Sequence, residues 1–177
     1  MRISVSGTHF SGKSTLIKAL LKALPNYAGI DEPYFLLEQE GYEFSIPPLL
    51  EDYEAQFKRS IQLILESRSH TIFDRCPLDF LGYAFAVGEK RVDLKSWIED
   101  MEEAIRLLDL IIFLPIEYRD RIAIPPSEDK KLRRIVDENL QEIFLDDSLG
   151  ILENIKVLEV TGSLEKRVER ILPLNST

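Results

Sequence analysis

The feature that most constrains this chain is a short glycine-bounded segment that joins an apolar run to a helical pattern. Residues 7–14 read Gly-Thr-His-Phe-Ser-Gly-Lys-Ser, and a threonine follows. Glycines at this spacing let the backbone curl until successive N–H groups converge on one phosphate at a helix N-terminus. In this Walker A pattern, Lys13 neutralises the β- and γ-phosphates and the Ser14 hydroxyl binds Mg²⁺. The nucleotide site is therefore predicted to contain Gly7, Thr8, His9, Phe10, Ser11, Gly12, Lys13, Ser14 and Thr15.

Apolar runs and helical patterns alternate along the rest of the chain. We expect helices between strands at residues 2–6, 27–31, 71–74, 110–114 and 155–160. The run at 110–114 is apolar at every position, which is typical of a buried parallel strand covered by helices on both faces. In such sheets the ligand binds at the carboxyl ends of the strands. The 177 residues contain no repeat or linker, so we predict one α/β domain over residues 1–177.

Composition narrows the class of protein. The chain has 22 basic and 31 acidic residues, a formal charge of −9, which disfavours non-specific binding to nucleic acid or anionic lipid. Its apolar runs fall short of the roughly 20 residues that span a bilayer, and no signal peptide is recognisable. A single cysteine, Cys76, fits a reducing compartment, so we expect a cytoplasmic protein. With so few soft ligands, oxygen-bound Mg²⁺ is the one metal predicted.

Charged residues after two further strands complete the predicted site. Asp74 and Arg75 close the expected strand at residues 71–74. A carboxylate there holds magnesium through water, and an arginine grips a phosphate or a sugar hydroxyl. Glu32 precedes a proline, which disfavours helix, so we expect its carboxylate to face the crevice as general base for an acceptor hydroxyl. Asp31, or neither residue, is the alternative base; a surface Asp–Arg pair and an acidic turn are the structural alternatives.

Four residues beside these positions are interpreted less specifically. Asp79 and Tyr83, four apart on one helix face, are either substrate contacts or a helix-start acid and a half-buried tyrosine. His9 is interpreted as a loop residue that donates hydrogen bonds rather than as a catalytic base. Cys76 is interpreted as a packed side chain rather than as a nucleophile.

A basic cluster follows the fourth strand. Residues 119–134 hold six basic and three acidic side chains, which favours a mobile lid, approximately residues 117–146, that closes over phosphates. The alternative is a solvated helix face. In contrast, residues 31–54 hold eight acidic residues and no basic one, which favours a neutral or cationic acceptor on that side. The predicted lid arginines are Arg119, which is also assigned to the nucleotide, Arg121, Arg133 and Arg134.

Three segments resemble P-loop kinases of the nucleoside and nucleotide kinase group, and most of all the small ATPase-like family that includes the ribosylnicotinamide kinase domain. They are residues 6–16, residues 73–84 and residues 161–167. In this family the purine ring rests at the last segment, which implies that Gly162 contacts the nucleotide. Glu32-Pro33 resembles deoxynucleoside kinases, whose glutamate there acts as base. The resemblance implies a five-stranded parallel sheet of order 2-3-1-4-5 with a helical lid.

These observations together predict an enzyme that moves the γ-phosphate of Mg·ATP to a small nucleoside- or nucleotide-like acceptor. Lys13, Glu32, Asp74 and Arg75 are its predicted catalytic residues, and GTP is an alternative donor. A second hypothesis is an ATP-binding module, with or without slow hydrolysis, that acts with a protein partner. A switch GTPase is less favoured, because the chain has no Asn-Lys-x-Asp segment. A homodimer is left open, since kinases of this type often pair through helices.

Overall fold

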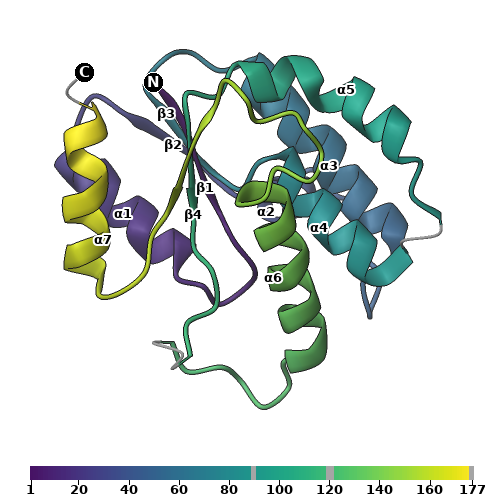
Figure 1. Cartoon of the computed structure of the whole chain (residues 1–177). Coiled ribbons are helices and arrows are strands. Elements are labelled where there is room, and N and C mark those ends of the chain that lie inside the picture. Colours follow the sequence, from purple (N-terminus) through teal and green to yellow (C-terminus); the bar gives the residue numbers. More distant parts are fainter. Residues whose placement is uncertain (89–90, 119–121, 176–177) are drawn as a thin grey trace.

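The computed structural model describes residues 1–88, 91–118 and 122–175, and its strands form one parallel sheet (Figure 1). The strands lie in the order β2-β3-β1-β4-β5. All four strand pairs are parallel. The predicted strand order, 2-3-1-4-5, and the predicted parallel sheet are both confirmed. The strands are β1 (Arg2–Ser6), β2 (Ala28–Ile30), β3 (Thr71–Asp74), β4 (Leu110–Phe113) and β5 (Lys156–Glu159).

Helices cover both faces of the sheet (Figure 1). One face carries α1 (Lys13–Ala23) and α7 (Leu164–Ile171), and the 3-10 helix η2 (Leu172–Asn175) follows α7. The other face is covered by α3 (Leu50–Leu65), α4 (Pro77–Gly88), α5 (Leu94–Arg106) and α6 (Lys130–Phe144). A short helix, α2 (Pro33–Gln39), lies beside α3. None of the helices in the described part of the chain has both the length and the apolarity needed to cross a membrane.

The helix α2 was not expected from the sequence. Glu32 keeps an extended backbone with ψ of 134°, as the following proline demands, but it is the N-cap of α2 rather than part of an open turn. Pro33 occupies the first turn, where its fixed φ suits a helix and its missing N–H costs nothing. The Glu32 carboxylate is therefore held between the end of β2 and the start of α2.

Two hydrophobic clusters hold the layers together. Ile3 and Val5 of β1 pack with α1 and α7, whereas Phe73 and Phe113 pack with the helices of the other face. All four residues of β4 are buried, because helices cover that strand on both sides. The alternation of the strand side chains between the two clusters fixes the register of the sheet.

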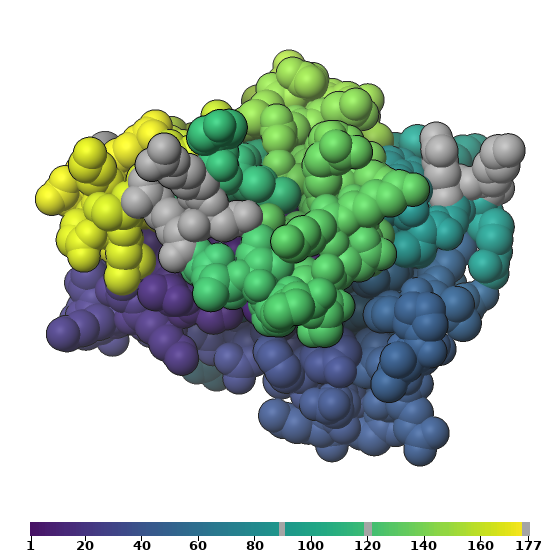
Figure 2. Space-filling model, turned by 90° about the horizontal axis from the view of Figure 1, so that it is seen from below, coloured from purple at the N-terminus to yellow at the C-terminus, as the bar shows by residue number. Residues whose placement is uncertain are grey.

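The register brings three strand ends together at one edge of the sheet. Val5 lies beside Asp74, and Ser6 lies beside Phe113. The loops that follow β1, β3 and β4 therefore lie along the same edge of the sheet, where ligands bind in parallel sheets. Figure 2 views this edge and shows residues 122–145 (green) between the C-terminal helix α7 (yellow) and the segment around residues 31–60 (blue).

Candidate functional site

The phosphate loop runs from the end of β1 to the start of α1, as its sequence predicts. Gly7 and Gly12 have φ of 142° and 94°, conformations that favour glycine. A Cβ added to Gly7 would stand 2.5 Å from the carbonyl oxygen of Leu114, so the loop needs glycine at this position for close approach to β4. Lys13 Nζ donates to the Thr8 carbonyl oxygen at 2.9 Å, across the loop.

Lys13 is a buried cation within this loop. Burial is the main cause that lowers the pKa of Lys13 to about 8, and the positive charge of Arg75 is the second. The negative charge of Asp74 acts in the opposite direction. An anion bound in the loop would restore the stabilisation that burial removes from the ammonium group. The loop therefore holds a buried cation at the N-terminus of α1, an arrangement that suits a phosphate group.

Ser14 and Asp74 form the candidate magnesium site. Ser14 Oγ donates to Asp74 Oδ2 at 3.0 Å, so the two predicted ligands do meet. Among the described residues, the buried Asp74 Oδ1 has no hydrogen-bond partner. Burial raises the pKa of Asp74 although Lys13 acts against it. An orphaned carboxylate oxygen beside a hydroxyl is a donor set that Mg²⁺ accepts, with phosphate oxygens and water completing its shell.

Glu32 and Arg75 meet beside the loop. Arg75 Nε donates to Glu32 Oε1 at 2.6 Å, and its Nη1 donates to the Gly7 carbonyl oxygen at 2.7 Å. Burial acts to raise the pKa of Glu32, but the charges of Arg75 and Lys13 outweigh it and hold the pKa below its usual value. Glu32 is therefore an ionised carboxylate, able to accept a hydrogen bond or a proton.

Asp79 lies inside the fold rather than in a cavity. Its side chain is fully buried, Oδ1 accepts from the Gly7 N–H at 2.9 Å, and Oδ2 accepts from the Cys76 N–H at 2.9 Å. Both oxygens are thus committed to backbone groups at the start of the phosphate loop and of α4. Of the two interpretations of Asp79, the geometry favours the helix-start acid over the substrate contact. Cys76 is buried too, and burial raises its pKa to about 12, as for a packed thiol.

Tyr83 and His9 form a hydrogen-bonded pair at the edge of the loop. The Tyr83 hydroxyl accepts from the His9 N–H at 3.0 Å and from Arg75 Nη2 at 3.3 Å, which leaves its proton for His9 Nδ1 at 2.7 Å. Burial is the main cause that lowers the pKa of His9 to about 4, and the positive charge of Arg75 is the second. His9 is therefore neutral, and its Nε2 lies 2.5 Å from Glu128 Oε1. These contacts suit a loop residue that positions its neighbours.

The predicted lid arginines have different environments. Arg133 of α6 is buried and donates to the carbonyl oxygens of His9 and Phe10, so it holds the phosphate loop. Arg134 lies on the exposed side of α6, with Nε 3.6 Å from Glu138 Oε1, which fits the solvated-face alternative. Arg119 and Arg121 lie outside the described residues.

A second arginine on the loop, Arg167, was missed by the sequence analysis. It projects from α7, is buried, and donates to the carbonyl oxygens of Ser11 and Gly162 at 3.1 Å each. Its Nη2 also donates to Glu117 Oε1 at 2.7 Å, and that oxygen accepts from the Gly162 N–H. In sequence, Arg167 is one of several charged residues on a short polar helix, so no signal distinguished it.

Three adjoining cavities surround the loop. The central one, of about 370 Å³, lies over Lys13 and Ser14. A cavity of about 170 Å³ shares three lining residues with it, His9, Glu32 and Arg75. On the other side, a cavity of about 200 Å³ shares Gly12, Thr15 and Ile122 with the central one and reaches Gly162 and Arg167. The three cavities form one continuous series of spaces, lined by the predicted nucleotide residues 9–15 and by the predicted substrate residues Glu32, Arg75 and Tyr83. Gly7, Thr8 and Asp79 are not among the lining residues.

The smallest of these spaces has aromatic walls, of which the sequence analysis named Tyr83 alone. Tyr34 and Phe44 stack at 4.3 Å between ring centroids, and Tyr53 stacks on Tyr83 at 5.1 Å. Its other lining residues are Pro48, Gln56 and Phe80. These side chains come from α2, the following loop, α3 and α4, and no spacing in sequence connects them. The packing of α2 and of α4 against α3 brings them together.

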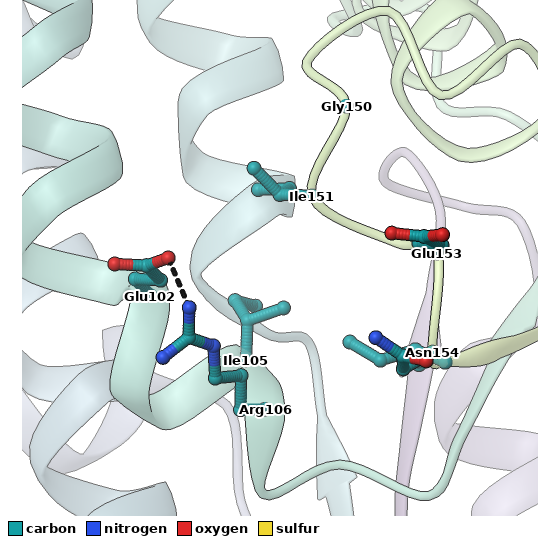
Figure 3. Close-up of a pocket in the computed structure, with 8 residues that line it drawn as sticks. Glu102, Ile105, Arg106, Gly150, Ile151, Glu153 and Asn154 are labelled. Atoms are coloured by element: carbon teal, nitrogen blue, oxygen red, sulfur yellow. Dashed lines mark hydrogen bonds and ion pairs between the residues drawn. The ribbon is translucent and has the colours of Figure 1, made fainter.

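A further hollow of about 370 Å³ lies away from the loop, between α5 and the segment that leads into β5 (Figure 3). Because this segment precedes β5 and α5 precedes β4, the hollow is at the amino ends of these strands. The one arginine drawn in it, Arg106, pairs with Glu102 at 2.5 Å. It has no glycine-rich loop, and we assign it no part in the site.

Several solved structures resemble this chain over nearly its whole length. A thymidylate kinase from Ehrlichia chaffeensis has a TM-score of 0.69 at 14% identity, with 98% of each chain covered. The deoxyadenosine kinase from M. mycoides with bound dATP has a TM-score of 0.66 at 16% identity, with 100% of each covered. For the thymidylate kinase from Candida albicans the TM-score is 0.62 at 15% identity, with 99% of this chain and 90% of that chain covered.

No protein-family model and no curated protein sequence matches the chain. At the identities of the solved structures, the likeness establishes the fold. This five-stranded parallel sheet with flanking helices is the fold of the P-loop nucleotide kinases. The finer resemblance to the ribosylnicotinamide kinase domain stays a prediction.

Proposed function

We propose that this chain, with its kinase fold, is a phosphotransferase that moves the γ-phosphate of Mg·ATP to a hydroxyl of a nucleoside-like acceptor. The observation that carries the proposal is the shared wall between two cavities. Glu32 and Arg75 line both the space over Lys13 and the aromatic-walled space beside it. A donor in the first and an acceptor in the second would meet at an ionised carboxylate and an arginine, as in-line transfer requires.

The donor is assigned to the two spaces on the α1 and α7 side. The triphosphate lies in the central cavity, where the loop N–H groups and Lys13 stabilise the charge that develops during transfer. The purine lies in the cavity lined by Gly162, Leu164 and Arg167. Ser14 and Asp74 would hold a magnesium ion, which would neutralise part of the charge of the phosphates. Arg133 and Arg167 hold the loop carbonyls from the lid and from α7.

Glu32 is assigned the role of orienting and deprotonating the acceptor. Its pairing with Arg75 makes it a weak base, which suits a loose transition state in which the nucleophile's proton leaves late. Asp31 is exposed, so Glu32 is favoured over it. The proton of the acceptor hydroxyl passes to Glu32 as the new P–O bond forms, while the bond to the β–γ bridging oxygen breaks and its electrons leave with ADP.

The acceptor is a nucleoside rather than a nucleotide. A planar ring fits between the aromatic walls, and Gln56 brings a side-chain amide that can bond the edge of such a ring. Among the described residues, the arginine that lines this cavity is Arg75, and it already bonds Glu32 and the Gly7 carbonyl oxygen. A second phosphate would find no uncommitted described cation there. A cytoplasmic location and a homodimer stay predictions.

The test combines an acceptor panel with a matched pair of variants. The purified chain is incubated with Mg·ATP and with nucleosides, nucleoside monophosphates or ribosylnicotinamide, and phosphorylated product and ADP are both measured. We expect Glu32→Gln, which still accepts from Arg75, to lower kcat about 100-fold or more with unchanged ATP affinity. The exposed Asp31→Asn serves as control and is expected to match the unaltered chain. Tight ATP binding with no product from any acceptor would reject the proposal and favour a partner-dependent ATP-binding module.

A further inference from the structure

Phe10 has a conformation that a bulky residue rarely adopts. Its φ is 55°, in the left-handed region that Gly7 and Gly12 enter without strain. The chain keeps a phenylalanine here, in a loop where glycine or asparagine would be less strained. The Phe10 carbonyl oxygen accepts from Arg133 at 3.5 Å, and its ring packs edge-on to His9 with centroids 6.0 Å apart. Surrounding contacts thus hold the strained residue in place, as is typical of functional sites.

The Phe10 ring belongs to an apolar rim around the phosphate cavity. As whole residues, Phe10 is 38% exposed and Phe35 on α2 is 51% exposed. Both line the cavity over Lys13, together with Ile122 of the lid segment. The three apolar side chains come from the phosphate loop, from the acceptor side and from the lid. Exposure of large apolar side chains to water costs free energy. Their position around a site for a charged group therefore points to a function that they perform when this site is occupied.

The relevant chemistry is the competition between two nucleophiles. When the acceptor hydroxyl attacks, its oxygen bonds the γ-phosphorus, the bond to the β–γ bridging oxygen breaks, and ADP and phosphorylated acceptor form. When water attacks, the same bonds change and the products are ADP and inorganic phosphate. Glu32 faces the same cavity and would take the proton in either case. Discrimination therefore has to come from keeping water away from the transferring group.

We propose that Phe10, with Phe35 and Ile122, forms an apolar rim that excludes water from the transferring phosphate and so directs it to the acceptor. The inference rests on the proposed function. It makes Phe10 a specificity-determining residue, whose side chain selects the acceptor oxygen over the oxygen of water. The rim spans three segments, and Ile122 completes it in this structure.

The test uses substitutions that separate the ring from the backbone conformation. Phe10→Asn keeps a residue that tolerates the left-handed region and removes the apolar ring, whereas Phe10→Leu keeps an apolar side chain. Without acceptor, we expect Phe10→Asn to raise the rate of ADP release from Mg·ATP about tenfold. In Phe10→Leu, which retains an apolar side chain, the increase in ADP release is expected to be at least about threefold smaller than in Phe10→Asn.

Phe35→Ser opens the same rim from outside the loop and is expected to raise ADP release as well. Ile46→Ser is the matched control, because Ile46 is 98% exposed and does not line the cavity. Unchanged ADP release in both Phe10→Asn and Phe35→Ser would overturn the inference. Equal release from Phe10→Leu and Phe10→Asn would also overturn it, because the loop backbone and not the apolar surface would then be responsible.

The proposed function fails separately, if the unaltered chain phosphorylates no acceptor. The comparison of ADP release among the variants needs no acceptor, so in that case it still decides whether the rim keeps water away from the bound phosphate. Where an acceptor is phosphorylated, the ratio of phosphorylated acceptor to ADP is expected to fall in Phe10→Asn and to hold in Ile46→Ser. A constant ratio in Phe10→Asn contradicts the inference.

Discussion

Replacing Asp79 by asparagine separates its two interpretations, because a structural acid and a substrate contact respond differently. The Asp79 carboxylate accepts from two backbone N–H groups, of Gly7 and Cys76, and lies 3.6 Å from Arg75 Nη1. Asparagine has one carbonyl oxygen and one NH₂ group in the same space. One of the two N–H groups must then face another donor, and the negative charge beside Arg75 is lost.

The magnitude follows from burial. A buried donor without a partner costs about 1–3 kcal/mol. Loss of the charge adds to this, although Glu32 still compensates Arg75, so the full penalty of a broken buried ion pair does not apply. We expect Asp79→Asn to lower the free energy of unfolding by about 3 kcal/mol in total. For a chain of this length that corresponds to a decrease in Tm of about 6–12 °C.

The assay is thermal and urea unfolding, with ATP affinity and acceptor KM measured on the same samples. Asp93→Asn is the matched control, since Asp93 caps α5 at an exposed position, where its side chain accepts from the Ser96 N–H, and asparagine caps equally well. Because Gly7 begins the phosphate loop, Asp79→Asn is also expected to weaken ATP binding. A Tm equal to that of the control, combined with a raised acceptor KM, would refute the structural role and restore the substrate contact.

Two further predictions concern His9 and Arg167. The low pKa of His9, about 4, means that the unfolded chain binds this proton more strongly. The free energy of unfolding should therefore fall as the pH decreases from about 6.5 to about 4, and His9→Gln should flatten this part of the profile in urea unfolding. Arg167→Ala is expected to weaken ATP binding about tenfold, because it releases the Ser11 carbonyl oxygen of the phosphate loop and the Gly162 carbonyl oxygen before α7. Arg170→Ala, on the exposed side of the same helix, should leave the calorimetric ATP affinity unchanged, and equal losses in both variants would exclude a specific role of Arg167.

The phosphate loop and the strand ends were predictable because their signals are local. Glycine spacing, a following helix and an acid after an apolar run are all visible within a few residues, and they place Lys13 and Asp74 correctly in the fold. The strand order came from the resemblance to kinases, since periodicity carries no information about neighbours. The helix α2 was hidden by Pro33, which excludes helix at the residue before it but starts one at its own position.

The aromatic cavity and Arg167 were not predictable in the same way. Tyr34, Phe44 and Tyr53 meet through packing between elements, and their positions in sequence carry no common period. Arg167 differs from Arg170 only in the side of α7 that turns toward the loop. Both cases depend on tertiary contacts that one sequence does not encode in any local pattern.

The separate origins of the two outer cavities have a consequence for engineering. The walls of the proposed acceptor cavity come from His9, Glu32 and residues 34–83, whereas the walls of the cavity beyond Gly12 come from the loop, residue 122 and residues 162–167. A chimaera could therefore exchange residues 34–56 with those of another chain of this fold and leave the hydrogen bonds of Arg167 to Ser11, Glu117 and Gly162 in place. In this sense the residues proposed to select the acceptor can be exchanged as a unit, while the residues proposed to bind the nucleotide stay unchanged.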